Sequence, residues 1–215
     1  MVTDVVTVIQ MKIWHKRKNG KHHRGDIRKE YYPDGAIKAH RYFVNDRLHR
    51  DDGPAVECFY RTGGIQHRSW HKDGTFYRLD GPVMESFSES GVLRSAMWYK
   101  DGMYHREDGP AVEIFYPDGR RQEHTWFCND RIHRIGGPAL EQYWPNGNIS
   151  VRHFFADGEY HNLNGPAYES YNSDGTVKEA TYYLDGESLP EPEHRRRVAL
   201  LKLSAKHSAN REVSL

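Results

Sequence analysis

The sequence repeats itself with a fixed period, and this constrains the fold more than any other feature. Five segments share a polar turn, a Gly-Pro pair and a short strand, and they begin at His49, Tyr77, His105, His133 and His161. Each start lies 28 residues after the one before it. Such a period is typical of arrays in which one small unit packs only against its neighbours. Because a catalytic site is needed once, residues that recur in every copy are better explained as architecture.

Each copy predicts two short strands joined by tight turns. In the copy that begins at His105 the strand segments are PAVEIFY and RQEHTWFCN, which are rich in β-branched and aromatic residues. The first turn ends in a glycine, which suits the left-handed position that closes a hairpin. These glycines are Gly35, Gly63, Gly91, Gly119, Gly147 and Gly175. The Asp-Gly and Asn-Asp pairs at the other end of the hairpin suit the reverse turn.

We therefore predict an all-β fold, an elongated single antiparallel sheet of tandem 28-residue hairpins with a C-terminal capping helix. The expected parts are an N-terminal edge strand at 1–11, the hairpin array at 12–189, the helix at 190–206 and a flexible tail at 207–215. Met11 is also a possible alternative start of the chain.

The helix prediction depends on Pro192 near its start and on the apolar residues Val198, Leu200, Leu201 and Leu203. The main interpretation is a cap on the open end of the sheet. A helix that binds a partner or a basic helix on a membrane surface is the alternative.

Composition narrows the class of protein. The net charge of +1 on 215 residues gives no general attraction to nucleic acid or membrane. The 14 Tyr, 8 Phe and 5 Trp favour a thin sheet with aromatic layers over a deep core. Cys58 and Cys128 predict free thiols in a reducing compartment. Since neither a long apolar run nor a signal peptide is evident, we expect a cytoplasmic protein of the producing or infected cell that is not secreted.

Alternation along the strands defines columns of equivalent side chains. A structural ladder is predicted for Glu57, Glu85, Glu113, Glu141 and Glu169. On the second strand, two adjacent positions such as Trp98 and Tyr99 are both aromatic in most copies. Neighbours cannot both face inward in a regular strand, so we expect either a bulge or one exposed row. We place the Trp98 column in the core and the Tyr99 column on the surface.

The recurring histidine is the most tempting candidate for a metal ligand. It occurs at His23, His49, His105, His133 and His161. Equivalent residues two strands apart are about 9.5 Å from each other, whereas zinc ligands converge on one ion at about 2.0–2.1 Å. We therefore predict no metal site and no cofactor. We expect each histidine to fix its turn through a hydrogen bond from side chain to backbone.

Arginine follows the histidine position at Arg24, Arg50, Arg78, Arg106 and Arg134. A ladder glutamate lies seven residues beyond each of the last four. The main interpretation is an arginine–glutamate pair that joins the turn to the next strand. The alternative is a row of guanidinium groups for phosphates or acidic side chains. Neighbouring carboxylates such as Asp52 and Asp108 argue against a nucleic-acid backbone, which needs uncompensated positive charge.

The turns and hairpins resemble the MORN repeat, more closely its variant with H-R-x-D-G-P turns and Y-x-x-D/N-G hairpins. The resemblance covers roughly residues 12–189, and the period is longer than that of the common glycine-rich unit. It implies a single-sheet hairpin array used for protein binding and scaffolding. Lipid contact has been suggested for some members, and related variants occur among bacterial antitoxins and in phages and large DNA viruses.

Taken together, these features predict a non-enzymatic module that binds a protein partner of unknown identity across one face. It would act as a neutraliser or inhibitor of a host or toxin protein, or as an assembly scaffold. The predicted binding residues are Tyr99, Phe127, Phe155, His105, Arg106, His133 and Arg134. Aromatic residues and arginine are enriched in interface centres. A binder of single-stranded nucleic acid, or of phosphoinositides at a membrane surface, is the alternative. We predict no catalytic residues, because no copy carries a distinct constellation.

Overall fold

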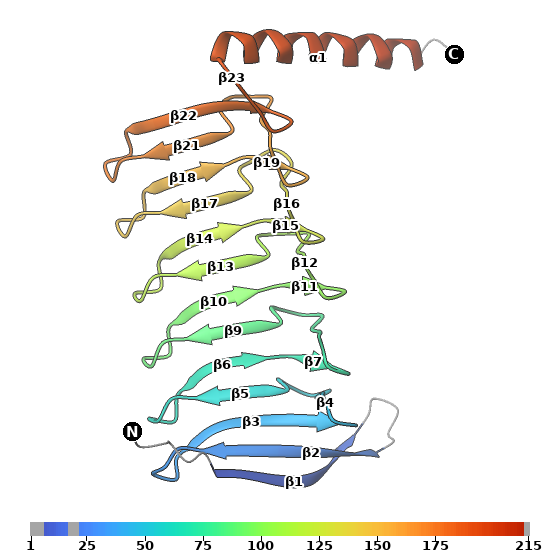
Figure 1. Ribbon diagram of the computed structural model, residues 1–215, viewed down its shortest axis with the longest axis vertical. Helices are drawn as coiled ribbons and strands as arrows, with labels where there is room; N and C mark the ends of the chain where they lie inside the picture. Colours follow the sequence, from blue (N-terminus) through green and yellow to red (C-terminus); the bar gives the residue numbers. More distant parts are fainter. Residues whose placement is uncertain (1–6, 17–21, 213–215) are drawn as a thin grey trace. The chain divides into compact units, whose positions relative to one another are not determined.

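The computed structural model describes residues 7–16 and 22–212 and divides into two compact units, one running to Asp130 and the other starting at Arg131. Both units are built from β-hairpins that follow one another in chain order (Figure 1). The second unit also contains α1 (Glu191–Glu212). The predicted all-β class, with tandem hairpins in antiparallel sheet and a C-terminal helix, is confirmed.

The sheet of the first unit has the strand order β1-β2-β3-β5-β6-β9-β10-β13-β14, with antiparallel neighbours. Its strands are β1 (Thr7–Lys16), β2 (His22–Tyr31), β3 (Ile37–Val44), β5 (Val56–Phe59), β6 (Ile65–Ser69), β9 (Met84–Phe87), β10 (Leu93–Met97), β13 (Val112–Phe115) and β14 (Arg121–Thr125). Short strands follow the longer ones: β4 (Arg47–Leu48), β7 (His71–Lys72), β8 (Thr75–Phe76), β11 (Tyr99–Lys100), β12 (Met103–Tyr104) and β15 (Phe127–Cys128).

The second unit continues the same pattern. Its longer strands run in the order β17-β18-β21-β22-β23 and are antiparallel. They are β17 (Leu140–Tyr143), β18 (Ile149–His153), β21 (Tyr168–Tyr171), β22 (Val177–Leu184) and β23 (Glu187–Leu189). The short strands are β16 (Arg131–Ile132), β19 (Phe155–Ala156) and β20 (Glu159–Tyr160).

The hairpin turns have the predicted chemistry. Gly63 has a φ of +88° and its N–H donates to the carbonyl of Tyr60 at 2.9 Å. The strand register shifts between Cys58 and Phe59, just before this turn. Glycine at a positive φ therefore closes each hairpin and creates a one-residue bulge. At the other end, Asp73 and Gly74 have φ values of +52° and +89°, which are those of a type I′ turn.

The buried interior is thin and made largely of small side chains. Five residues that follow the Gly-Pro pair have no exposed surface: Ala55, Val83, Ala111, Ala139 and Ala167. Their backbone carbonyls accept hydrogen bonds within the sheet; that of Ala111, for example, is 2.8 Å from the N–H of Trp98. Because these positions have no exposed surface, the column is closely packed, and a larger side chain would need its neighbours to move.

Helix α1 starts one residue later than predicted and continues past residue 206, since helix-favouring residues such as Ala209 and Arg211 follow. Of its expected apolar residues, Val198 is buried against Leu184 and Leu189. The other three are not part of the packed face: Leu200, Leu201 and Leu203 are 57%, 48% and 53% exposed. They project away because only the first turns of α1 pack on the last hairpin. Within the described part of the chain, no helix is long and apolar enough to cross a membrane.

Candidate functional site

The recurring histidines fix the turn of the following repeat. The Nδ1 atom of His49 accepts the backbone N–H of Asp73 at 3.1 Å, and His133 does the same for Asp157 at 3.0 Å. Both aspartates have positive φ values, of +52°. His105 and His161 contact the N–H groups of Asn129 and Asp185 in the same way, at 3.3 Å. The Nδ1 atoms of His49 and His161 also lie 3.0 and 2.7 Å from the carboxylates of Asp73 and Asp185. The histidine column therefore contacts the positive-φ turns through backbone and side chain, as predicted for its role in fixing a turn.

Three arginines of the following column, Arg50, Arg78 and Arg106, are each sandwiched between an aromatic ring and their own turn. The guanidinium carbon of Arg106 lies 4.1 Å from the centroid of Trp98. Its Nε donates to Asp108 at 2.9 Å, and its Nη1 donates to the carbonyl of Pro110 at 3.2 Å and lies 3.7 Å from Glu113. Arg50 and Arg78 repeat this arrangement over Tyr42 and Trp70. The predicted arginine–glutamate pair is present, and cation–π stacking adds to it.

The same sandwich explains the glycine of the Asp-Gly-Pro turn. A methyl group on Gly109 would lie 2.8 Å from the guanidinium carbon of Arg106, and one on Gly81 would lie 2.7 Å from that of Arg78. The last copy carries Asn162 in place of arginine, and there a methyl group on Gly165 would be 3.8 Å from the nearest atom. The amide of Asn162 still donates to the carbonyl of Pro166, at 2.7 Å. At Gly81 and Gly109 the glycine is therefore explained by the nearby arginine plane and not by a positive φ.

The short strands carry a second aromatic layer, which we call the aromatic ladder. In the first unit it consists of His71, Phe76, Tyr99, Tyr104 and Phe127. Successive ring centroids are 4.4, 5.2, 4.3 and 5.1 Å apart. In the second unit, Phe155 stacks on Tyr160 at 4.3 Å. These distances lie near the lower end of the range of about 4.5–7 Å that is typical of aromatic pairs.

The aromatic ladder changes the interpretation of Tyr99, Phe127 and Phe155. Each is half-buried, as is Trp98, so neither aromatic row is left open to solvent. The strand is interrupted at Trp98, and the return strand β12 covers Tyr99 while Arg106 covers Trp98. Burial raises the pKa of Tyr99. Trp98 and Tyr99 are thus both half-buried, and the expected division into a core row and a surface row is not seen, because a return strand supplies a cover that alternation along one strand cannot predict.

One face of the first unit carries two adjacent rows of uncharged side chains, which we call the neutral face. Cross-strand pairing aligns the first row, Cys58, His67, Ser86, Ser95 and Ile114. The second row is Val56, Ser69, Met84, Met97 and Val112. Burial lowers the pKa of His67, which favours its neutral form. Most of these residues are half-buried, and Val56 and Ser69 are buried.

The opposite face bears the glutamate ladder. Its residues are aligned across the strands in the order Glu57, Arg68, Glu85, Ala96, Glu113 and His124. Arg68 donates from Nε to Glu85, and the arginines of the turns approach the same carboxylates. The two faces of the first unit therefore differ sharply in charge. The neutral face ends at Arg41, opposite Val56, and at Glu123, opposite Ile114.

The aromatic ladder borders the neutral face at one end. The hydroxyl of Tyr104 lies 3.8 Å from the sulfur of Met97, and the Oγ of Ser69 lies 2.9 Å from Nε2 of His71. The described part of the first unit contains no helix, so none covers the sheet. The predicted residues Tyr99 and Phe127 thus lie at the border of the neutral face, whereas the side chains of His105 and Arg106 are engaged in their turns.

A column that we did not predict links neighbouring hairpins. The hydroxyl of Tyr32 donates to the carbonyl of Phe59 at 2.9 Å, and that of Tyr60 donates to Phe87 at 2.8 Å. Trp144 does the same through its indole N–H, to Tyr171 at 3.1 Å. The signal was present in the sequence, because a polar-tipped aromatic recurs just before the hairpin turn at 32, 60, 116 and 144.

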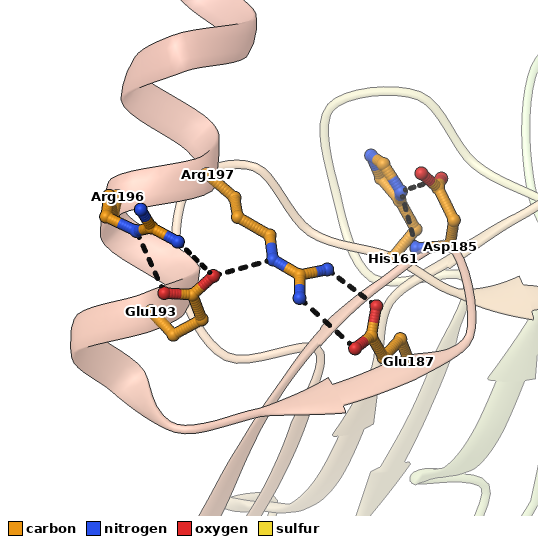
Figure 2. A network of polar contacts seen from close by, with 6 residues as sticks. All are labelled: His161, Asp185, Glu187, Glu193, Arg196 and Arg197. Carbon is orange, nitrogen blue, oxygen red and sulfur yellow. Dashed lines mark hydrogen bonds and ion pairs between the residues drawn. The ribbon is translucent and has the colours of Figure 1, made fainter.

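Charged pairs fasten α1 to the last hairpin (Figure 2). Arg197 reaches both carboxylate oxygens of Glu187 in β23, at 2.6 and 3.3 Å, and its Nε donates to Glu193 at 2.9 Å. Hydrogen bonds from Arg196 first, and then from Arg197, lower the pKa of Glu193 to about 2. Behind them, His194 is 2% exposed and its Nε2 lies 2.8 Å from the carbonyl of Asn162. The helix therefore replaces a further repeat at this end of the second unit.

The described residues contain no group of three or more His, Cys, Asp or Glu side chains that converges as a metal site would. Cys58 is half-buried and Cys128 is exposed. Burial raises the pKa of the Cys58 thiol.

The fold and the columns define a tandem β-hairpin repeat protein. Within it, residues 27–45 match the family of the MORN repeat variant. This segment comprises the end of β2, the hairpin turn at Gly35 and β3, which is one hairpin of the array. The resemblance to the variant repeat is thereby confirmed for that hairpin. No curated protein matches the chain.

Proposed function

We propose that the protein is a non-catalytic binding module that holds a protein partner against the neutral face of its first unit. The match to a MORN repeat variant supports a repeat-based binding module. The observation that carries the proposal is the charge asymmetry of the sheet. Rows of Val, Met, Ile, Cys and Ser side chains cover one face, and the ion-paired glutamate ladder covers the other.

The composition of the neutral face fits the centre of a protein interface. Such centres are depleted of charged residues and enriched in methionine and aromatic residues. Met84 and Met97 lie in the same row, and Tyr104 of the aromatic ladder contacts Met97 at the border. Methionine also adapts its shape to a partner at little cost. Tyr99 and Phe127 would then contribute to the rim of the interface.

The arginine column, by contrast, offers little free charge for a polyanion. Arg50, Arg78 and Arg106 each contact an aromatic ring, a proline carbonyl and a carboxylate of their own turn. A phosphate would have to displace these contacts. This supports a protein partner over single-stranded nucleic acid.

A matched set of serine substitutions tests the proposal. Ser86 and Ser95 pair across the strands of the neutral face, with their Oγ atoms 2.7 Å apart. Ser90 lies in the exposed turn of the same hairpin. Affinity capture from the source cell, followed by mass spectrometry, would identify the partner. The double variant Ser86→Arg/Ser95→Arg should lose it and Ser90→Arg should keep it, with circular dichroism showing that both fold. Equal capture by both variants would contradict the neutral face as the binding surface.

A further inference from the structure

Strand β1 forms one edge of the sheet of the first unit among the residues that the structure describes. It is ten residues long, stands at the end of the strand order and pairs only with β2 among the described residues. Its outer side therefore presents a row of backbone N–H and C=O groups. A long edge strand of this kind is a template for another strand unless charge, proline or a covering element blocks it. β1 contains no proline.

The side chains of β1 that the structure describes are unusually exposed for apolar residues. Ile9 is 44% exposed and Met11 is 46% exposed. Met11 stands opposite Ile27 of β2, which is only 6% exposed. Gln10 donates to Asp26 at 3.1 Å. The apolar row of the sheet therefore continues to its last strand but has no neighbour there among the described residues, which makes a further strand with apolar residues in the same row favourable.

The sequence of β1 is itself such a strand, and among the registers with the axis at the middle of the strand, at residues 10 to 12, one is favoured. If two copies meet in antiparallel fashion about a two-fold axis at Met11, Ile9 stands opposite Ile13 and Gln10 opposite Lys12. Apolar residues then face apolar residues, and no lysine faces a lysine. An axis at Lys12 sets two lysines opposite each other, which is destabilising. An axis at Gln10 sets Val8 opposite Lys12.

We propose that β1 pairs antiparallel with β1 of a second copy of this chain, with Met11 opposite Met11, so that the sheets of the two first units continue into each other. Such an isologous contact closes after two copies, because each chain offers this edge once. The proposal is independent of the neutral face, so either can fail alone.

Oligomeric state and cysteine cross-linking test the register directly. Light scattering should give twice the chain mass for the wild type and the chain mass for Lys12→Pro. Met11 and Ile27 form a hydrogen-bonded pair between β1 and β2, so the N–H of residue 12 points outward, and proline there removes an edge donor without breaking the β1–β2 hydrogen bonds. In a Cys58→Ser/Cys128→Ser background, Met11→Cys should form a disulfide-linked dimer on mild oxidation. Directly opposed residues are about 4.5–5.5 Å apart, which is within disulfide reach.

Ile9→Cys is the matched control on the same strand and face. In the proposed register the two copies of residue 9 are separated by four residues along the strand, about 13 Å, so they should not cross-link. A wild type that is monomeric at all concentrations would overturn the proposal, as would a larger assembly. Cross-linking of Ile9→Cys as efficient as that of Met11→Cys would overturn it as well. Ser86→Arg/Ser95→Arg should leave the dimer intact.

Discussion

Arg106 lies between Trp98 and Gly109, with its guanidinium carbon 4.1 Å from the ring centroid and 2.8 Å from the point where a methyl group on Gly109 would stand. One contact therefore involves three columns of the repeat, the aromatic column of Trp98, the arginine column of Arg106 and the glycine column of Gly109. It also explains why an arginine and a glycine occur together in four copies, whereas the last copy combines Asn162 with a glycine that has space around it.

Gly109→Ala should destabilise the fold by about 1–3 kcal/mol, the usual range for overpacking. The added methyl group must push Arg106 off the ring of Trp98. Gly165→Ala is the matched control, and it should change the stability by less than about 0.5 kcal/mol because the nearest atom is 3.8 Å away. Urea unfolding would measure both. The cost of Gly109→Ala should fall when Arg106 is also changed to Asn; a cost that stays the same would show that the clash is not its cause.

His49→Ala should destabilise more than His133→Ala. Both changes leave a turn N–H without its acceptor. The His49 side chain is 6% exposed and that of His133 is 23% exposed. Water can therefore replace the lost acceptor more easily at His133. We expect about 1–3 kcal/mol for His49 and about 0.5–1 kcal/mol for His133. Thermal and urea unfolding would compare them. Equal losses, or none, would mean that the histidines do not hold the turns.

Trp98→Ala and Tyr99→Ala should both destabilise the fold, by about 2–4 kcal/mol each. The range lies somewhat below that for fully buried aromatics because both side chains are half-buried. Each loses a stacking partner, Arg106 for Trp98 and Tyr104 for Tyr99. A loss below about 0.5 kcal/mol for Tyr99→Ala would restore the interpretation of its column as an exposed row.

Stability should fall as the pH drops from 7.5 to 5.5. Burial lowers the pKa values of His40, His67 and His71 from the ordinary 6.5. The unfolded chain therefore takes up protons first, so the stability is complete above about pH 6.5 and is lost as the pH falls towards the folded-state pKa values. His71→Phe keeps the contact with Phe76, because Phe occupies this column at Phe127 and Phe155, and should flatten the pH dependence. Melting temperatures at the two pH values would test this, and an unchanged slope in His71→Phe would contradict it.

The sequence predicted the features that depend on local chemistry. A glycine that must adopt a positive φ, as at Gly63, is visible from its turn alone, and the glutamate ladder follows from alternation along a strand. The sequence predicted that the histidines bond to the backbone of a turn. It did not predict that this turn lies 24 residues away, in the next repeat.

What the sequence did not predict depends on covers supplied by other segments. The half-buried state of Tyr99 depends on β12 folding back over it, and that of Trp98 depends on the arginine of the following turn. Likewise, Leu200 and Leu203 fit a helical apolar pattern, but the last hairpin is reached only by the first turns of α1. The periodicity of the sequence identifies the apolar side of a strand or helix. Whether that side is buried depends on which neighbouring elements pack against it.

The most direct test of the neutral face is its protection by the bound partner. In the background without cysteines, Ser95→Cys reports on the neutral face and Ser90→Cys on the exposed turn of the same hairpin. Thiol labelling would be timed with and without the captured partner. We predict that the partner slows labelling at residue 95 several-fold and leaves residue 90 unchanged. Unchanged labelling at residue 95, with slowing at residue 90, would contradict the neutral face as the binding surface.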